Sequence, residues 1–156
     1  AKLINGFNQK FIPKIYYAKG NYFETNKKLG IKHLIYPVPT EASLGLHLGL
    51  DMSMQMRFGP DVEWVNEINY TVDPNRIDLF HEDIIKYLPD IKKEDLHPGY
   101  SGIRPKLKNK GEGKSDFLIQ SSKEHGMENL VNLFGMESPG LTSSLVIADY
   151  VADLIE

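Results

Sequence analysis

The feature that most constrains the fold is a strict alternation of residue types over Leu44–Leu50, followed after a short connection by Met54–Phe58. Successive side chains of a strand point to opposite faces, so two such runs predict a half-buried antiparallel hairpin. One face carries leucines, and the other carries His47 between Gly45 and Gly49. We therefore expect a lone imidazole beside a flat vacancy that fits a planar ligand. A surface histidine in a glycine-tolerant strand is the open alternative.

Composition excludes several classes of protein. The chain has 156 residues, 41% of them apolar and 25% charged, which suits one globular chain with a normal core. A formal charge of -3 argues against nucleic acid or anionic lipid as the main partner. The absence of cysteine excludes disulfides, zinc–thiolate sites and a thioether link to a cofactor, and the histidines lack the spacing of a metal site. No apolar run is long enough to span a membrane and no signal peptide is evident, so we expect a cytoplasmic location.

Periodicity and the placement of Gly and Pro predict the other elements. A helix should begin at the Asp73-Pro74 cap and run to about Leu88, with Ile77, Phe80, Ile84 and Leu88 on its buried stripe. Met52, Met54 and Met56 share a strand face and are expected in the core. Further strands are expected at Lys14–Glu24, His33–Pro39, Tyr100–Leu107 and Asp116–Ser121, with a surface loop at Lys108–Lys114.

The C-terminal segment follows a different pattern. Leu130–Phe134 is a short apolar strand of the kind found in sheets covered on both faces. After Gly135, the segment Ser138–Thr142 opens a strongly apolar helix, which we expect to be buried. Free backbone N–H groups at a helix start attract partial negative charge, although an ordinary capped helix has the same end. Together these elements form half of a βαβ unit.

Strand alternation groups Tyr100, Arg104 and Lys106 on one face. The planar guanidinium of arginine binds a carboxylate through two parallel charge-assisted hydrogen bonds. The group is therefore a candidate carboxylate site. A basic edge strand that discourages aggregation is the alternative.

Six runs of the sequence, in order, resemble the C-terminal half of FAD-dependent oxidoreductases of the D-amino-acid oxidase superfamily. They are KGNYF, LIYPVP, LGLHLGLD, RFGPDVEW, GIRPKL and HGMENLVNLFGMESPGLTSSLVIADYVADL. The resemblance is nearest to the L-2-hydroxyglutarate oxidase/dehydrogenase branch and covers the chain from about Pro13. It implies an α+β fold, in which residues 1–121 form a substrate domain with a mixed, largely antiparallel sheet. Residues 122–156 would be the closing strand and helix of a glutathione-reductase-type FAD domain, whose G-x-G-x-x-G fingerprint is absent here.

The resemblance also implies roles for individual residues. His47 would be the general base, and Arg104 would pair with the substrate carboxylate. Tyr100, Lys106 and Arg57 are candidates for the far end of a dicarboxylate. The residues implied to border the flavin are Gly45, Gly49, Gly135, Ser138, Pro139, Gly140, Leu141 and Thr142.

The implied reaction is hydride transfer from C2 of a small 2-hydroxy acid, such as L-2-hydroxyglutarate, to FAD that is not attached through cysteine. An amine substrate, as in glycine or sarcosine oxidases, is a second possibility, and a non-catalytic binding module is a third. If most cofactor contacts come from the half not present here, this chain alone should be inactive and bind FAD poorly. Its apolar closing faces would then favour self-association.

Overall fold

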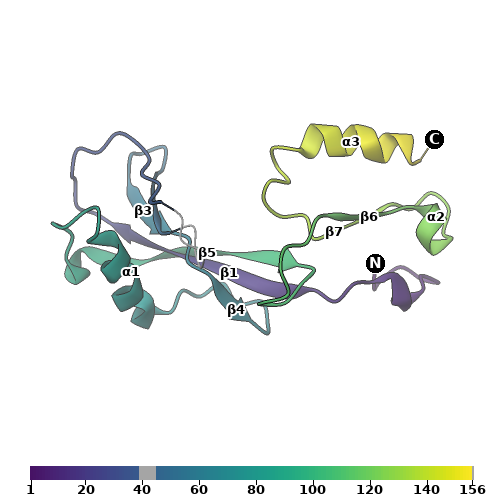
Figure 1. Cartoon of the computed structure of the whole chain (residues 1–156), viewed down its shortest axis with the longest axis horizontal. Helices are drawn as coiled ribbons and strands as arrows, with labels where there is room; N and C mark the ends of the chain where they lie inside the picture. The colour runs from purple at the N-terminus through teal and green to yellow at the C-terminus, as the bar shows by residue number, and fades with distance from the viewer. Residues whose placement is uncertain (39–44, 156) are drawn as a thin grey trace. The chain divides into compact units, whose positions relative to one another are not determined.

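The computed structural model describes residues 1–38 and 45–155, and its chain forms two compact units (Figure 1). We call Ala18–Ile103 the sheet unit, and Ala1–Tyr17 together with Arg104–Glu156 the terminal unit. Each is described by itself. The functional division at residue 121 rests on the resemblance and stays a prediction.

The sheet unit is built on an antiparallel framework, which confirms the predicted α+β class with a largely antiparallel sheet. Its strand order is β2-β3-β1-β4, and β5 also pairs with β1. The strands are β1 (Tyr16–Thr25), β2 (His47–Leu50), β3 (Met56–Gly59), β4 (Glu63–Val65) and β5 (Leu96–Lys106).

The predicted hairpin is confirmed by the antiparallel pairing of β2 with β3. Leu48 lies opposite Phe58, and both side chains are fully buried. His47 lies opposite Gly59, so the imidazole belongs to the other face of the hairpin. The expected division of the hairpin into a core face and a second face that carries His47 therefore holds.

The turn of the hairpin is longer than predicted. The Asp51 carboxylate accepts hydrogen bonds from the backbone N–H of Ser53 (2.8 Å) and of Gln55 (2.9 Å), and Met54 adopts a left-handed φ of 62°. The alternation thus breaks before Met56. Of the three methionines expected in the core, Met56 is buried, whereas Met52 and Met54 are exposed.

The strand predicted at His33–Pro39 is wrong for its described residues. Only an isolated bridge forms, in which Ile35 and Leu48 exchange two backbone hydrogen bonds of 2.9 and 3.1 Å. Pro37 lacks an N–H, so the ladder cannot continue past it. Pro39 and Leu44 lie outside the described residues.

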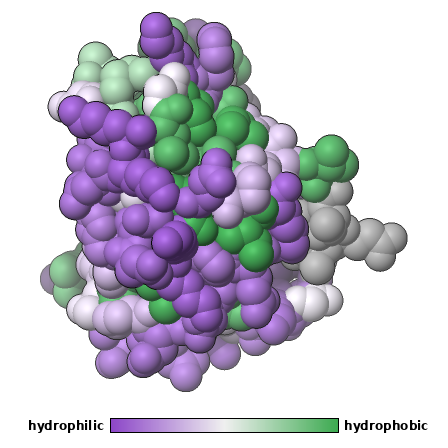
Figure 2. Space-filling view, turned by 90° about the vertical axis from the view of Figure 1, so that its left-hand side faces the viewer, coloured by the Kyte–Doolittle hydropathy of each residue, from purple (hydrophilic) through white to green (hydrophobic). Residues whose placement is uncertain are grey.

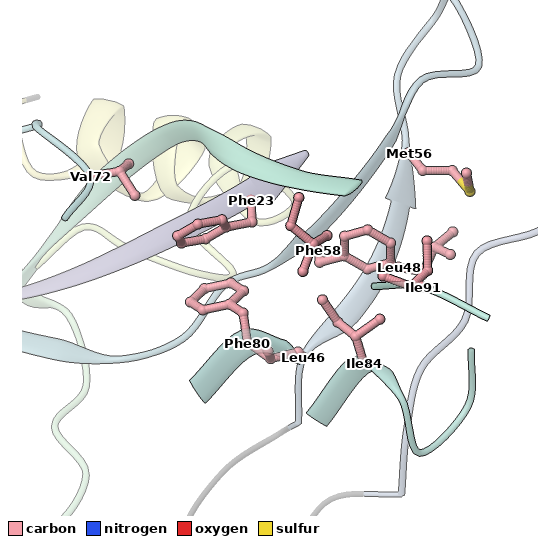
Figure 3. Close-up of a cluster of buried hydrophobic side chains, with 10 residues drawn as sticks. Phe23, Leu46, Leu48, Met56, Phe58, Val72, Phe80, Ile84 and Ile91 are labelled. Atoms are coloured by element: carbon pink, nitrogen blue, oxygen red, sulfur yellow. The ribbon is translucent and has the colours of Figure 1, made fainter. Parts of the chain in front are cut away.

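The core of the sheet unit lies between the sheet and α1 (Ile77–Ile84), as Figure 3 shows. The ring centroids of Phe23 and Phe80 are 4.6 Å apart. Phe80 and Ile84, on the predicted stripe of the helix, are fully buried. The helix begins later than predicted, because Pro74–Arg76 forms a separate 3-10 turn, η2, capped by the side chain of Asp73, and it ends earlier, at Ile84. A second 3-10 turn, η3 (Lys93–Asp95), precedes β5.

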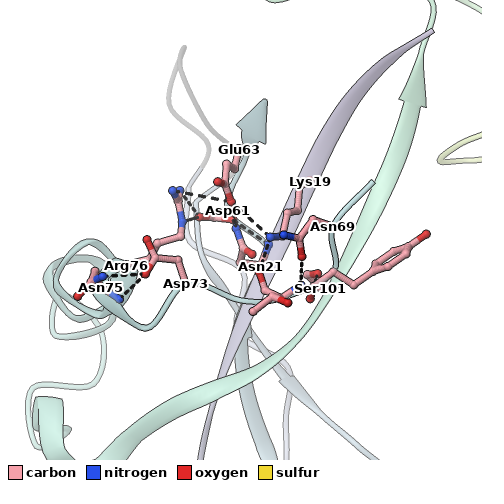
Figure 4. A network of polar contacts seen from close by, with 11 residues as sticks. Lys19, Asn21, Asp61, Glu63, Asn69, Asp73, Asn75, Arg76 and Ser101 are labelled. Atoms are coloured by element: carbon pink, nitrogen blue, oxygen red, sulfur yellow. Dashed lines mark hydrogen bonds and ion pairs between the residues drawn. The ribbon is translucent and has the colours of Figure 1, made fainter. Parts of the chain in front are cut away.

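A network of charged side chains, shown in Figure 4, links β1 to β4 and to η2. The buried amide of Asn21 donates to Asp61 (3.1 Å) and to Glu63 (2.9 Å). The Nε of Arg76 donates to Asp61 (2.7 Å), and Lys19, which is 4% exposed, lies 3.9 Å from Glu63. Two cations thus balance two carboxylates, as buried charge requires.

The terminal unit contains a two-stranded antiparallel sheet and three short helical elements. They are η1 (Gln9–Phe11), β6 (Leu118–Gln120), α2 (Ser122–His125), β7 (Asn132–Phe134) and α3 (Ser144–Asp153). The loop Lys108–Lys114 is exposed, as predicted.

The prediction that the last helix is buried is wrong for this structure. No residue of α3 is buried, and Leu145, Val146 and Tyr150 are 80%, 73% and 52% exposed. Besides α3, the described part of the terminal unit contains a two-stranded sheet, two shorter helical elements and the ends of β1 and β5. They provide too little apolar surface to cover a helix that is apolar on most sides.

Hydrophilic side chains surround a band of apolar surface on the face drawn in Figure 2. Exposed large hydrophobic side chains of the sheet unit include Leu34, Tyr36, Leu79 and Ile85. Apolar atoms make up much of any protein surface, so this band identifies no partner by itself.

Replacing Phe58 with alanine should lower the free energy of unfolding by about 3–5 kcal/mol, because it leaves a cavity at the centre of the core. Urea denaturation measures the loss. The matched control is Leu79→Ala on α1, where the side chain is 57% exposed and the expected change is within about 0.5 kcal/mol. Equal losses in both variants would contradict the assigned core.

Candidate functional site

His47 is the first residue of β2 and lies against an aromatic ring. The centroids of the His47 and Tyr36 rings are 4.3 Å apart, with the planes tilted by 51°. The segment that carries Tyr36 is held to β2 by the bridge between Ile35 and Leu48. The imidazole is thus half-buried and packed on one side.

The flat vacancy expected beside His47 is not present. An added Cβ at Gly45, where φ is +75°, would lie 3.1 Å from the Cβ of Pro37. An added Cβ at Gly49 would lie 3.3 Å from the Cγ of Arg57. A Cβ would thus crowd a neighbouring side chain at both positions, and the left-handed φ of Gly45 additionally favours glycine. Their role toward a cofactor stays a prediction.

Arg57 and Tyr100 come together on the face of the sheet that carries Gly49. The guanidinium carbon of Arg57 lies 5.6 Å from the centroid of the Tyr100 ring, a cation–π distance. Tyr100 in turn stacks on Tyr22, with the centroids 4.5 Å apart and the planes 10° from parallel. Among the described residues, no carboxylate forms an ion pair with Arg57.

Tyr87 forms a hydrogen bond to the residue that precedes the strand of His47. The Tyr87 hydroxyl donates a hydrogen bond of 3.0 Å to the carbonyl of Leu46, the residue before His47. Burial raises the pKa of Tyr87 well above its usual value of about 10, and the nearby Asp83 carboxylate adds to the effect. The phenol therefore stays protonated and remains a donor. The sequence pattern did not point to this contact.

Arg104 and Lys106 share a carboxylate partner in the terminal unit. The Nζ of Lys106 lies 2.5 Å from Oε1 of Glu137, and Nη1 of Arg104 lies 4.0 Å from Oε2. The Glu137 side chain is 11% exposed, whereas that of Arg104 is 45% exposed. Sequence reasoning missed Glu137, although an acidic residue inside the segment GMESPG was a signal that could have been tested against the two cations.

The segment Gly135–Thr142 leads from β7 into α3. The N–H of Gly140 bonds to the carbonyl of Glu137, and the N–H of Ser143 bonds to the carbonyl of Pro139 (3.0 Å). Within the described ranges, the N–H groups of Leu141 and Thr142 donate to no protein acceptor. A hollow of about 660 Å³ adjoins them, lined mainly by apolar residues of β7, this segment and α3.

The structure thus groups the predicted site residues in two sets. His47, Arg57 and Tyr100 belong to the sheet unit. Arg104, Lys106 and the residues of Gly135–Thr142 belong to the terminal unit. The common slot for His47 and Arg104 stays a prediction, because the two residues belong to different units.

Comparison with known proteins identifies the family. The profile described as DAO, FAD dependent oxidoreductase, matches residues 1–154, and the chain belongs to this family. The chain is 45% identical, over 98% of its length, to the L-2-hydroxyglutarate dehydrogenase, mitochondrial, of Arabidopsis thaliana. It is 20% identical, over 99% of its length, to a glycerol 3-phosphate dehydrogenase of Caloramator mitchellensis. The predicted resemblance to FAD-dependent oxidoreductases is confirmed.

A solved structure shares the fold. The dithionite-reduced L-alpha-glycerophosphate oxidase of Mycoplasma pneumoniae, with FAD bound, matches 92% of this chain with a TM-score of 0.73 and 19% identity. The chain spans 34% of the Arabidopsis protein, 30% of the Caloramator protein and 37% of the oxidase chain. No helix among the described residues is long and apolar enough to cross a membrane.

The residues around α3 fit part of a flavin. The N–H donors of Leu141 and Thr142, which meet no acceptor in the part of the chain that the structure describes, lie beside a mainly apolar hollow. A flavin ring has apolar faces and carries hydrogen-bond acceptors along one edge, which matches this arrangement.

Among the described residues, no cluster of three or more His, Asp or Glu side chains is arranged to hold a metal ion.

Tyr87→Phe tests the hydrogen bond between the Tyr87 hydroxyl and the carbonyl of Leu46, the residue before His47. Because the folded-state pKa of Tyr87 is raised, its contribution to stability is complete below about pH 10 and is lost as the pH rises toward the folded value. We expect the variant to lose about 1 kcal/mol at pH 7 and to show a weaker decline of stability above pH 10. Denaturation curves at pH 7 to 11 measure both effects. Tyr70→Phe, at an exposed tyrosine, is the control, and an identical alkaline decline in all three proteins would refute the assignment.

Proposed function

We propose that this chain is part of an FAD-dependent oxidoreductase that oxidises the CH–OH group of a small 2-hydroxy acid such as L-2-hydroxyglutarate. The observation that carries the proposal is the 45% identity to an L-2-hydroxyglutarate dehydrogenase over 98% of the chain. The fold and the family agree with a flavoprotein. Because the chain spans 34% of that relative, the activity is proposed for the complete protein.

The segment Gly135–Thr142 would hold the flavin at one edge. The N–H groups of Leu141 and Thr142, which have no acceptor among the described residues, lie in the turn that leads into α3 and would donate to ring acceptors. When bound, the flavin supplies the acceptor for the hydride that leaves C2 of the substrate. We further propose that no residue of this chain links the cofactor through a thioether, since its sequence contains no cysteine.

His47 would act as the general base. A neutral imidazole can take the proton of the 2-hydroxyl group as the hydride leaves C2, so that charge does not build up on the alcohol oxygen. The ring contact with Tyr36 and the Tyr87 hydrogen bond beneath Leu46 would limit the movement of the imidazole. Both contacts would help to orient the base before the substrate arrives.

Two arginines would bind the ends of a dicarboxylate. Arg104 is half-exposed and offers a planar donor pair for the C1 carboxylate. Arg57, stacked on Tyr100 and without a carboxylate partner among the described residues, suits the distal carboxylate. A substrate with one carboxylate would forgo the second contact.

An amino acid remains the alternative substrate, because Arg104 would bind the carboxylate of either class. Two matched proteins are named for glycerol phosphate compounds, which are alcohols, and this favours a CH–OH donor. The cytoplasmic location stays a prediction, and the Arabidopsis relative is named as mitochondrial. Self-association through the exposed side chains of α3 is likewise a prediction.

His47→Gln should slow flavin reduction by L-2-hydroxyglutarate about 10²- to 10⁴-fold, because an amide cannot take the proton. Anaerobic stopped-flow absorbance of the protein made from the complete reading frame measures the rate. The flavin content should be unchanged. His33→Gln, at an exposed histidine outside the proposed site, is the control. An unchanged rate in His47→Gln would remove the imidazole from the mechanism.

Arg104→Lys should raise the KM for the 2-hydroxy acid about tenfold or more, because lysine cannot form the paired contact with a carboxylate. The dissociation constant for FAD should change little. Steady-state kinetics and FAD titration of the same preparation provide both values. Lys110→Ala, in the exposed loop, serves as the matched surface variant. Parallel losses in substrate and flavin binding would argue against the role of Arg104.

A further inference from the structure

We propose that Glu137 sets the charge of the carboxylate site by holding Lys106 in an ion pair, which leaves Arg104 as the cation that binds the substrate. The inference rests on the proposed role of Arg104 and deepens it. It assigns Glu137 as a positioning residue. It also replaces the expectation that Lys106 contacts the substrate directly.

The distances separate the two cations. Lys106 and Glu137 are in contact at 2.5 Å, whereas Arg104 lies 4.0 Å from the same carboxylate, beyond hydrogen-bond distance. The side chain of Lys106 is 30% exposed and that of Arg104 is 45% exposed. Lys106 is thus committed to a carboxylate that is nearly buried, and Arg104 keeps most of its donors for a ligand.

The backbone around Glu137 holds the carboxylate at the end of β5. An added Cβ at Gly135 would lie 2.8 Å from the Cγ of Leu107, the residue after Lys106. At Gly140 an added Cβ would lie 2.6 Å from the carbonyl of Glu137, which already accepts the N–H of Gly140. The segment is therefore folded tightly upon itself and against β5. This close packing limits backbone movement on both sides of Glu137.

Charge counting gives a signed prediction. Two cations and Glu137 sum to one positive charge in the unmodified protein. Glu137→Gln leaves two positive charges, and Lys106→Gln leaves none and frees Glu137 to pair with Arg104. The double variant again has one positive charge. Anion affinity should follow this order.

The experiment measures equilibrium binding of 2-oxoglutarate, a 2-oxo dicarboxylate that cannot donate the hydride, to the protein made from the complete reading frame. Isothermal titration calorimetry gives the dissociation constants. Glu137→Gln should bind about fivefold more tightly and Lys106→Gln about fivefold more weakly, a factor that corresponds to about 1 kcal/mol for unit charges 4 Å apart in water. The double variant should match the unmodified protein. Raising the salt concentration should reduce these differences.

The other outcomes overturn the proposal. If Lys106 contacts the ligand directly, the double variant binds as weakly as Lys106→Gln. If Glu137 is only structural, Glu137→Gln lowers the melting temperature without tightening binding. Should Glu137→Gln fold poorly because Lys106 loses its partner, the double variant removes both members of the ion pair, and its affinity relative to Lys106→Gln still decides between these outcomes.

Arg104→Gln keeps this test apart from the proposed function. If it leaves 2-oxoglutarate binding unchanged, the carboxylate role of Arg104 fails, and this inference fails with it. If Arg104→Gln weakens binding while the Glu137 and Lys106 variants ignore the charge order, the inference alone fails.

Discussion

The pairing of β2 with β3 is the constraint on which the sheet unit depends. Leu48 against Phe58 turns one face of the hairpin into the core, and the same register places His47 opposite Gly59 on the other face. A shift by one residue would bury the imidazole and expose the leucines. The position of the proposed base is therefore a consequence of core packing, reinforced by the hydrogen bond from Tyr87 to Leu46.

The proposed carboxylate site shows a division of labour between similar side chains. Arg104 and Lys106 are two residues apart on one strand, yet their surroundings differ because only Lys106 touches Glu137 closely. Arg57 contacts no carboxylate among the described residues; its guanidinium lies over the ring of Tyr100, which stacks on Tyr22. Residue type alone did not distinguish these three cations, and their partners did.

The sequence predicted features that depend on local periodicity and missed those that depend on distant contacts. Alternation located the hairpin, and the stripe containing Phe80 and Ile84 located α1. The left-handed Met54 was missed because it depends on the Asp51 carboxylate folding back on the turn. Tyr87 and Glu137 bond to residues 41 and 31 positions away, which no periodic pattern encodes. The exposure of α3 was missed because an apolar pattern predicts that a helix is covered but does not show which segment covers it.

The network around Asn21 has a consequence for the tolerance of this sequence to mutation. Asp61 binds both Asn21 and Arg76, so its loss leaves the guanidinium, which is largely closed to water, with only the more distant Glu63 carboxylate at 4.0 Å among the described residues. A substitution of one residue in this network should therefore destabilise the protein unless its partner is also substituted. We expect these positions to be inherited as a matched set, whereas residues of the exposed 108–114 loop are free to vary one at a time.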